Sequence, residues 1–174
     1  MRTAGRTPEP ERPRPGGGTP LGEAACRYQA NDIPIEDVPM IAAVALAAGL
    51  DSPALRELAG LPRHADPRDV RVAFEQALAE CGIALPAPDV ARRHGLRRLA
   101  ARFLAQDVAL ADLAADHWLD LEVRTAAERS FVALLPPCDC CTEYTLGLDR
   151  RAWEARLRSA ALALASSPPV GPGC

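Results

Sequence analysis

Lysine is absent from this chain of 174 residues, and its 20 basic residues are all arginine. A demand for guanidinium chemistry would not exclude lysine from every surface position, so the bias indicates a GC-rich bacterial genome. Acidic residues outnumber the arginines and give a formal net charge of −3. An acidic chain is not expected to bind nucleic acid or anionic lipid non-specifically, so neither is predicted as a partner.

Aromatic residues make up only 4% of the chain, and its apolar residues are mostly alanine and leucine. Strands recruit β-branched and aromatic residues, whereas alanine and leucine lose little rotamer freedom in a helix. The composition therefore predicts an all-α protein, built as a compact bundle of about seven helices. The length suits one domain with a single core.

Long apolar runs are also missing. The N-terminus has prolines and charges where a secretory signal needs an apolar segment, and the Ala-rich run from Met40 to Leu50 is too short to span a bilayer. We therefore expect a cytoplasmic protein without membrane contact. Thiols are reduced in that compartment, so the six cysteines are interpreted as free thiols, ligands or redox groups and not as a disulfide framework.

Both ends of the chain have the composition of disordered segments. Residues 1–22 hold five prolines and a run of three glycines with almost nothing to bury, which predicts a disordered tail. Residues 167–174 repeat that composition and are expected to be flexible. The helical domain is predicted over residues 23–166.

Capping signals divide this domain into helices. The expected N-caps are Asp37, Ser52, Asp66, Asp149 and Thr125, the last in a capping box with Glu128. Helices are expected over residues 38–48, 53–60, 67–81, 88–106, 110–120, 125–135 and 149–165. The first of them is apolar all round, which places it at the centre of the fold. Five helices contribute an aromatic residue interpreted as core, namely Phe74, Phe103, Trp118, Phe131 and Trp153.

Three cysteines within four residues are the least common feature of the chain. Cys138, Cys140 and Cys141 follow a Pro-Pro pair in a loop between two expected helices. Structural zinc sites take about four Cys or His ligands, often in pairs spaced as C-x₂₋₄-C. The spacing here is C-x-C-C without a second pair, so the candidate metal site adds His117 to the three cysteines.

Several readings of this cluster stay open. The fourth ligand could instead be Cys174, Cys81 or Cys26. Zinc or another thiophilic metal such as Cu(I) would suit thiolates, and adjacent Cys140 and Cys141 could form a strained, regulatory disulfide. The thiols could also simply pack or face solvent, because free cysteine behaves as a small hydrophobe. No cofactor is predicted beyond a metal at this cluster.

Two helices carry rows of charge. A basic face on helix 88–106 comprises Arg92, Arg93, His94, Arg97, Arg98 and Arg102. Without a helix-turn-helix spacing or interleaved aromatics, it is interpreted as a solvated face that pairs with the acidic excess. A row of three carboxylates, Asp112, Asp116 and Asp120, would need a second acidic group opposite to bind a divalent cation, so it is interpreted as surface.

Parts of the sequence resemble small, uncharacterised helical proteins of actinobacteria. The resemblance is carried by the segment Leu50–Gly60, by the Phe74 helix that ends in Cys81-Gly82-Ile83, and by the run from Arg97 through Leu113 to Trp118. It covers residues 37–120 and implies the compartment and the fold class, without a function to transfer.

Catalytic motifs are lacking, since neither a G-x-S-x-G elbow nor a phosphate-binding loop is present. The sequence therefore favours a non-enzymatic protein-interaction domain of the immunity or regulatory-accessory type, which binds a protein partner through an exposed helical face. The alternative is a metal-binding or thiol-redox module centred on the cluster from Cys138 to Cys141.

Overall fold

The structure, a computed structural model, describes residues 19–108, 113, 118, 121–136 and 147–167. These residues form seven α-helices and one short 3-10 helix without any strand, which confirms the predicted all-α class. The elements are α1 (Pro20–Gln29), η1 (Ile35–Asp37), α2 (Val38–Ala47), α3 (Pro53–Ala59), α4 (Pro67–Glu80), α5 (Pro88–Leu104), α6 (Ala126–Val132) and α8 (Arg150–Ala165).

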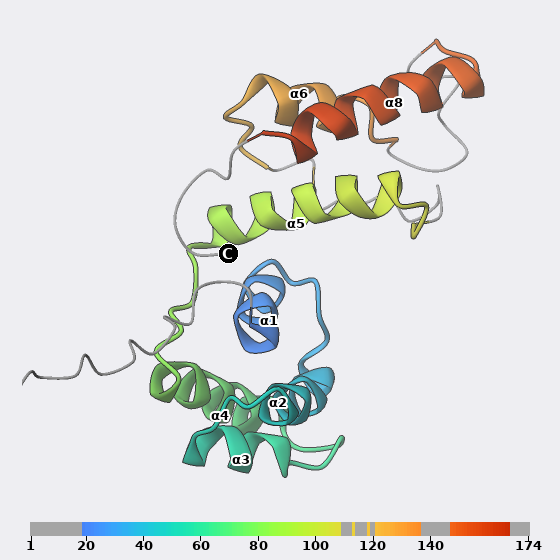
Figure 1. Cartoon of the computed structure of the whole chain (residues 1–174). Helices are drawn as coiled ribbons and strands as arrows, with labels where there is room; N and C mark the ends of the chain where they lie inside the picture. Colours follow the sequence, from blue (N-terminus) through green and yellow to red (C-terminus); the bar gives the residue numbers. More distant parts are fainter. Residues whose placement is uncertain (1–18, 109–112, 114–117, 119–120, 137–146, 168–174) are drawn as a thin grey trace, which may run out of the picture.

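The helices form two groups, with α1 placed between them (Figure 1). In one group α3 packs on both α2 and α4, and in the other α8 packs on α5 and α6. The buried hydrophobic residues likewise form two clusters, one within residues 21–78 and one within residues 96–164. The sequence predicted a single core, and this was wrong. The two clusters are separate because α1 meets α5 through charged side chains.

Helix α1 was not predicted, and it begins at Pro20, inside the segment 1–22 that was expected to be disordered. The hydroxyl of Thr19 accepts a hydrogen bond from the backbone N–H of Gly22 at 3.1 Å, and proline occupies the first turn. Leu21 and Cys26, both on this helix, are fully buried. A Thr-Pro start is a recognised helix signal, but the many prolines and glycines upstream concealed it.

The predicted helix over residues 110–120 lies almost wholly outside the described residues. Of that stretch only Leu113 and Trp118 are described, and both are buried. The five predicted core aromatics are confirmed, since each is nearly inaccessible to solvent. Among the described residues the number of α-helices equals the predicted seven, but one of them, α1, was not predicted.

Most predicted caps are confirmed. Ser52 accepts from the N–H of Leu55 at 3.1 Å, and Asp66 and Asp149 cap α4 and α8 in the same manner. Asp37 occupies the N-cap position of α2, but its side chain makes no capping hydrogen bond. These agreements are expected, because a cap needs only residues within three positions of one another.

The position of α2 contradicts the sequence interpretation. This apolar helix was expected at the centre of the fold, but it contacts other helices on one side only and leaves Met40 and Val44 61% and 52% exposed. An apolar pattern shows that a helix can be buried all round, but it does not provide enough neighbours to do so. Within the described ranges, no helix combines the length and the hydropathy needed to cross a membrane.

Candidate functional site

The predicted metal residues Cys138, Cys140, Cys141 and His117 lie outside the described residues, as does the alternative ligand Cys174. The acidic row of Asp112, Asp116 and Asp120 also lies outside them. Within the part of the chain that the structure describes, no three His, Cys, Asp or Glu side chains are grouped so that they could hold a metal ion. The metal and thiol-redox hypothesis therefore stays a prediction.

Two cysteines lie within the described residues. Cys81 is a free, half-buried thiol, as predicted. Cys26 on α1 is 1% exposed and forms a disulfide, so the expectation that the cysteines do not form structural disulfides is wrong for Cys26. Disulfide formation requires two sulfur atoms to meet in space, and the spacing of cysteines along the sequence does not show which of them do.

The predicted basic face of α5 is divided between two environments. Arg93 is only 3% exposed, and its guanidinium contacts the carboxylate of Glu128 at 2.9 Å. The prediction of a solvated face was therefore wrong for Arg93, because its guanidinium turns inward to Glu128 of α6 and to the backbone carbonyl of Glu122. On the other side of α5, His94 and Arg98 pair with acidic residues on and just after α1, and pairing with acidic residues was predicted for this face.

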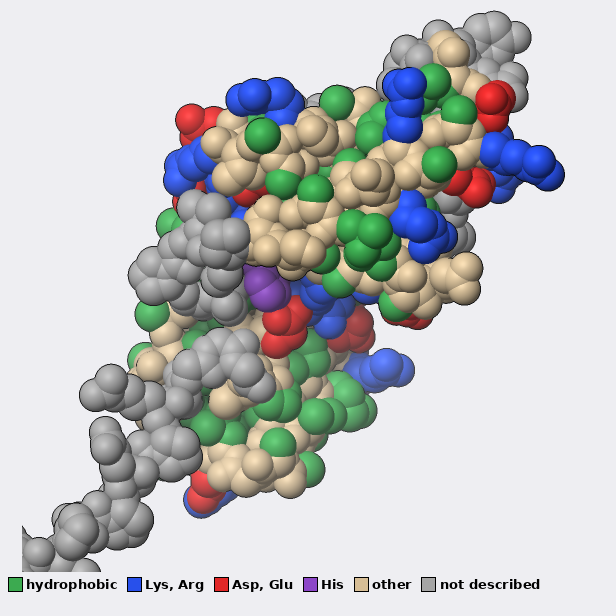
Figure 2. Space-filling model, turned by 45° about the horizontal axis from the view of Figure 1, so that its top comes forward, with side chains coloured by type: hydrophobic (Ala, Val, Ile, Leu, Met, Phe, Trp, Pro, Cys, Tyr) green, Lys and Arg blue, Asp and Glu red, His purple; other side chains and the backbone are tan. Residues whose placement is uncertain are grey.

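The acidic partners of His94 and Arg98 are Glu23 and Asp32. Glu23 on α1 accepts from Arg98 Nη1 at 2.9 Å and contacts His94 Nε2 at the same distance. Arg98 also donates to Asp32, which lies just after α1 and pairs in turn with Arg27. Figure 2 shows acidic, basic and histidine side chains side by side where the two groups of helices meet. This charged seam joins α1 to α5.

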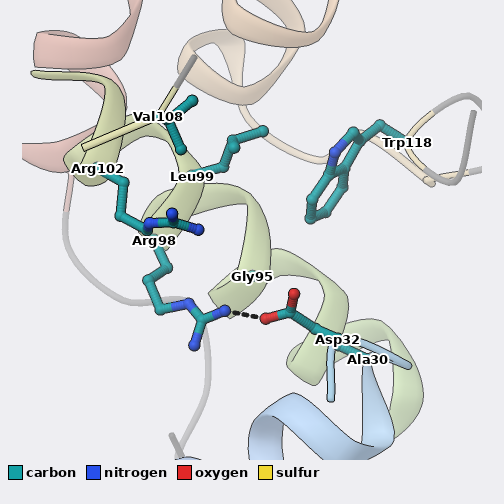
Figure 3. A pocket seen from close by; sticks show the side chains of 8 residues that line it. All are labelled: Ala30, Asp32, Gly95, Arg98, Leu99, Arg102, Val108 and Trp118. Atoms are coloured by element: carbon teal, nitrogen blue, oxygen red, sulfur yellow. Dashed lines mark hydrogen bonds and ion pairs between the residues drawn. The ribbon is translucent and has the colours of Figure 1, made fainter. Parts of the chain in front are cut away.

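A cavity of about 220 Å³ opens along the charged seam (Figure 3). Its lining residues are Ala30, Asp32, Gly95, Arg98, Leu99, Arg102, Val108 and Trp118. The two arginines lie on one side and the indole of Trp118 on the other, with Gly95 between them. A concave site with a few charged groups beside an aromatic ring can in principle hold a small ligand, so what the cavity can do depends on whether the two arginines are already paired.

The charges around the cavity are already paired. Burial lowers the pKa of Arg98, and repulsion from Arg27 and Arg102 adds to that effect, while hydrogen bonding to Glu23 opposes it. Arg102 donates to Asp107 at 3.1 Å. An anion entering the cavity would have to displace these carboxylates, so the arrangement is better suited to holding α1 against α5 than to binding a ligand.

Gly95 explains how Trp118 fits against the seam. A Cβ at this position would lie 3.1 Å from Cη2 of the indole and about 4.0 Å from Cβ of Ala30. Glycine inside a helix destabilises it by about 1 kcal/mol relative to alanine. The close approach of Trp118 to the α5 backbone is the physical reason that the residue is found here.

The exposed side of α2 is the second candidate surface. Met40, Val44 and Ala47 follow one another at i, i+4 and i+7, which places them on one stripe of the helix. All three are exposed, and α2 carries no polar or charged side chain. We call Met40, Val44 and Ala47 the α2 stripe.

Sequence reasoning did not find the α2 stripe or the carboxylates of the charged seam. The only sequence signal for the α2 stripe is the missing polar face of residues 38–47, which is equally typical of a central helix. Glu23 was predicted only as the first residue of the helical domain, Asp32 was given no role, and their partners on α5 are more than 60 residues away. Contacts over such separations leave no local pattern.

Comparison of the chain with known protein families, with curated proteins and with solved structures gives no match. The assignment of a function therefore depends on the two surfaces described above. One of them consists of paired charges, and the other is apolar and has no neighbour among the described residues.

Proposed function

We propose that this protein is a non-enzymatic interaction domain of the immunity or regulatory-accessory type that docks a partner protein through the α2 stripe. The observation that carries the proposal is the exposure of Met40 and Val44 on a helix without any polar side chain. Single exposed hydrophobic residues are common on soluble proteins. A whole apolar helix face at the surface is less common and is typical of interaction sites.

Covering the α2 stripe with a partner lowers the free energy, because it removes apolar surface from water. Removing apolar surface from water stabilises by about 25 cal/mol per Å². The α2 stripe brings no polar group that a partner would have to satisfy, so apolar contact alone can supply the binding free energy. Val38 and Ala42 of α2 are fully buried and anchor the helix to the fold, so the exposed stripe is preformed.

A cytoplasmic location is part of the proposal. A cytoplasmic location requires that the disulfide of Cys26 survive a reducing compartment. Disulfides persist there when their reduction potential is low enough to resist the glutathione pool. Burial of Cys26 supports such resistance, since a reductant must reach the sulfur to attack it. Trapping of free thiols in intact cells would show whether this disulfide persists there.

The experiment is purification of the protein from the cells that produce it, in three forms. The wild type is compared with Val44→Glu, which places a charge in the α2 stripe. The matched control is Leu162→Glu, which adds the same charge at an exposed leucine of α8 that is 53% accessible.

A partner that accompanies the wild type and Leu162→Glu but is lost from Val44→Glu supports the proposal. The same set of partners with all three forms contradicts it, and so does the absence of a stoichiometric partner from all of them.

A further inference from the structure

The N-terminal end of the α2 stripe is acidic. Glu36 and Asp37 immediately precede α2, and both are exposed. Neither forms an ion pair with any described residue, and the carboxylate of Asp37 does not cap the helix although it occupies the N-cap position. Two carboxylates are therefore presented to solvent beside an apolar surface, and no hydrogen bond or ion pair within the described fold uses them.

The opposite end of α2 does not balance this charge. The only basic residue between Ile33 and Gly60 is Arg56, and Asp51 already holds it through a hydrogen bond of 2.8 Å from Nε. Both side chains of this pair are exposed, and the hydrogen bond between them, with their opposite charges adding to it, raises the pKa of Arg56 and lowers that of Asp51. Within residues 33–60 the acidic side chains therefore outnumber the basic one, and the next nearby cation, Arg71 of α4, lines a pocket with Ile33 and Ile35 and forms no ion pair with Glu36 or Asp37 among the described residues.

The shape of the surface limits the kind of partner. The α2 stripe is a ridge on a helix whose backbone hydrogen bonds are internal, so it offers no strand edge to which a partner could add. Ridges of this kind pack against the grooves of another helix, and residues at i, i+4 and i+7 are the spacing that such packing uses. The small side chain of Ala47 allows a close approach.

We infer that the partner surface of the α2 stripe is an amphipathic helix with a basic end that lies over Glu36 and Asp37. This inference rests on the proposed function and specifies its partner. Apolar contact along the α2 stripe supplies binding free energy, and the basic end sets the direction in which the partner helix lies. A partner whose C-terminal end is basic would run antiparallel to α2, which also suits its own helix dipole.

Charge disfavours two other occupants. A second copy of the chain would bring another Glu36 and Asp37, and its residues 33–60 hold Arg56 as their one cation, already paired with Asp51, so the segments around two α2 stripes would mainly repel each other. An anionic lipid surface would be repelled by the same carboxylates. A basic helix is the occupant that satisfies both the apolar ridge and its acidic end.

The test uses three synthetic helical peptides of about 14 residues, which span about 20 Å and so cover the length of α2. All share one leucine stripe at helical spacing. The first carries two lysines at its C-terminal end, the second carries two glutamines there, and the third carries two glutamates. Binding to the full chain is measured by fluorescence anisotropy at about 50 mM and about 500 mM salt.

The lysine peptide is expected to bind about threefold to tenfold more tightly than the glutamine peptide at low salt, and the glutamate peptide more weakly than both. At about 500 mM salt most of the difference in affinity among the three peptides should disappear, because the carboxylates of Glu36 and Asp37 are exposed and therefore screened. The double variant Glu36→Gln, Asp37→Asn should bind all three peptides equally. The matched control is Glu122→Gln, Glu154→Gln, which removes the same charge from the second group of helices and should keep the preference.

The outcomes separate the two proposals. Equal binding of the three peptides, abolished by Val44→Glu, overturns the basic-end inference and leaves the docking function standing. No binding of any peptide to the wild type overturns both.

Sedimentation of the protein alone and with anionic vesicles completes the test. A dimer that Val44→Glu dissolves would identify a second copy as the occupant, and vesicle binding lost in the same variant would identify a lipid surface. Either result overturns the inference.

Discussion

The guanidinium of Arg93 in α5 donates from Nη1 to both carboxylate oxygens of Glu128 in α6, at 2.9 and 3.0 Å. Both side chains are almost inaccessible to solvent. The same carboxylate accepts the backbone N–H of Thr125 at 3.1 Å and that of Arg124 at 3.0 Å. One side chain thus closes the N-terminus of α6 and joins that helix to α5.

Replacing Arg93 is expected to be strongly destabilising. Arg93→Met leaves the carboxylate of Glu128 buried without its cation, and breaking a buried pair in this way costs about 3–5 kcal/mol. Urea unfolding followed by circular dichroism measures the loss. Arg151→Met, at an exposed position of α8, serves as the control and should change the free energy of unfolding by less than about 0.5 kcal/mol. Similar losses of unfolding free energy in both variants would show that the buried pair of Arg93 and Glu128 stabilises the fold no more than an exposed arginine does.

The exposure of α2 can be tested with two neighbouring substitutions. Val44→Glu places a carboxylate in solvent and should lower the free energy of unfolding by less than about 1 kcal/mol. Ala45→Glu, one residue further, forces a charge into a fully buried position and should prevent folding or cost more than about 3 kcal/mol. Thermal unfolding of both variants decides between a surface helix and a central one, because a central helix would tolerate neither substitution.

Glu80 should make the stability depend on pH. Its carboxylate at the end of α4 accepts the backbone N–H of Ala54 in α3 at 2.9 Å, and this bond, followed by that from Gln76, lowers the pKa of Glu80. A lowered pKa means that the stabilisation is fully present above the unfolded value of about 4.3. It is lost as the pH falls through the lower pKa of the folded state.

The measurement compares urea midpoints of the wild type and Glu80→Gln between about pH 6 and about pH 3. The advantage of the wild type should be largest near pH 6 and should shrink as the solution becomes more acidic. A difference that stays constant across this range would mean that the charge of Glu80 does not stabilise the contact between α3 and α4.

The disulfide of Cys26 should stabilise the oxidised protein. Removing a disulfide typically costs about 2–4 kcal/mol, so Cys26→Ala should lower the free energy of unfolding by that amount. Cys81→Ala removes a free, half-buried thiol and should cost less than about 1 kcal/mol. Unfolding the wild type in the presence of a reductant should reproduce the loss, because unfolding exposes the buried sulfur of Cys26. Reduction of the folded wild type by a low concentration of reductant would show that burial does not protect the bond.

The sequence predicted the local features of the fold well and the long-range ones poorly. Ser52, Asp66 and the capping box of Thr125 and Glu128 were recognisable, because each cap joins residues at most three positions apart. The ion pair of Glu128 with Arg93 was not, because its partners are 35 residues apart and belong to different helices. The acidic partners of His94 and Arg98 were missed for the same reason.

The amino-acid sequence by itself determined the helical class, because alanine and leucine favour helices and local caps mark where helices begin. It also determined that residues 38–47 carry no polar side chain. Only the tertiary structure decided which arginine of α5 is buried, how the core divides into two clusters, and which side of α2 faces solvent. Burial depends on elements that meet across the fold, and the α2 stripe is exposed because the helices around it cover only one side.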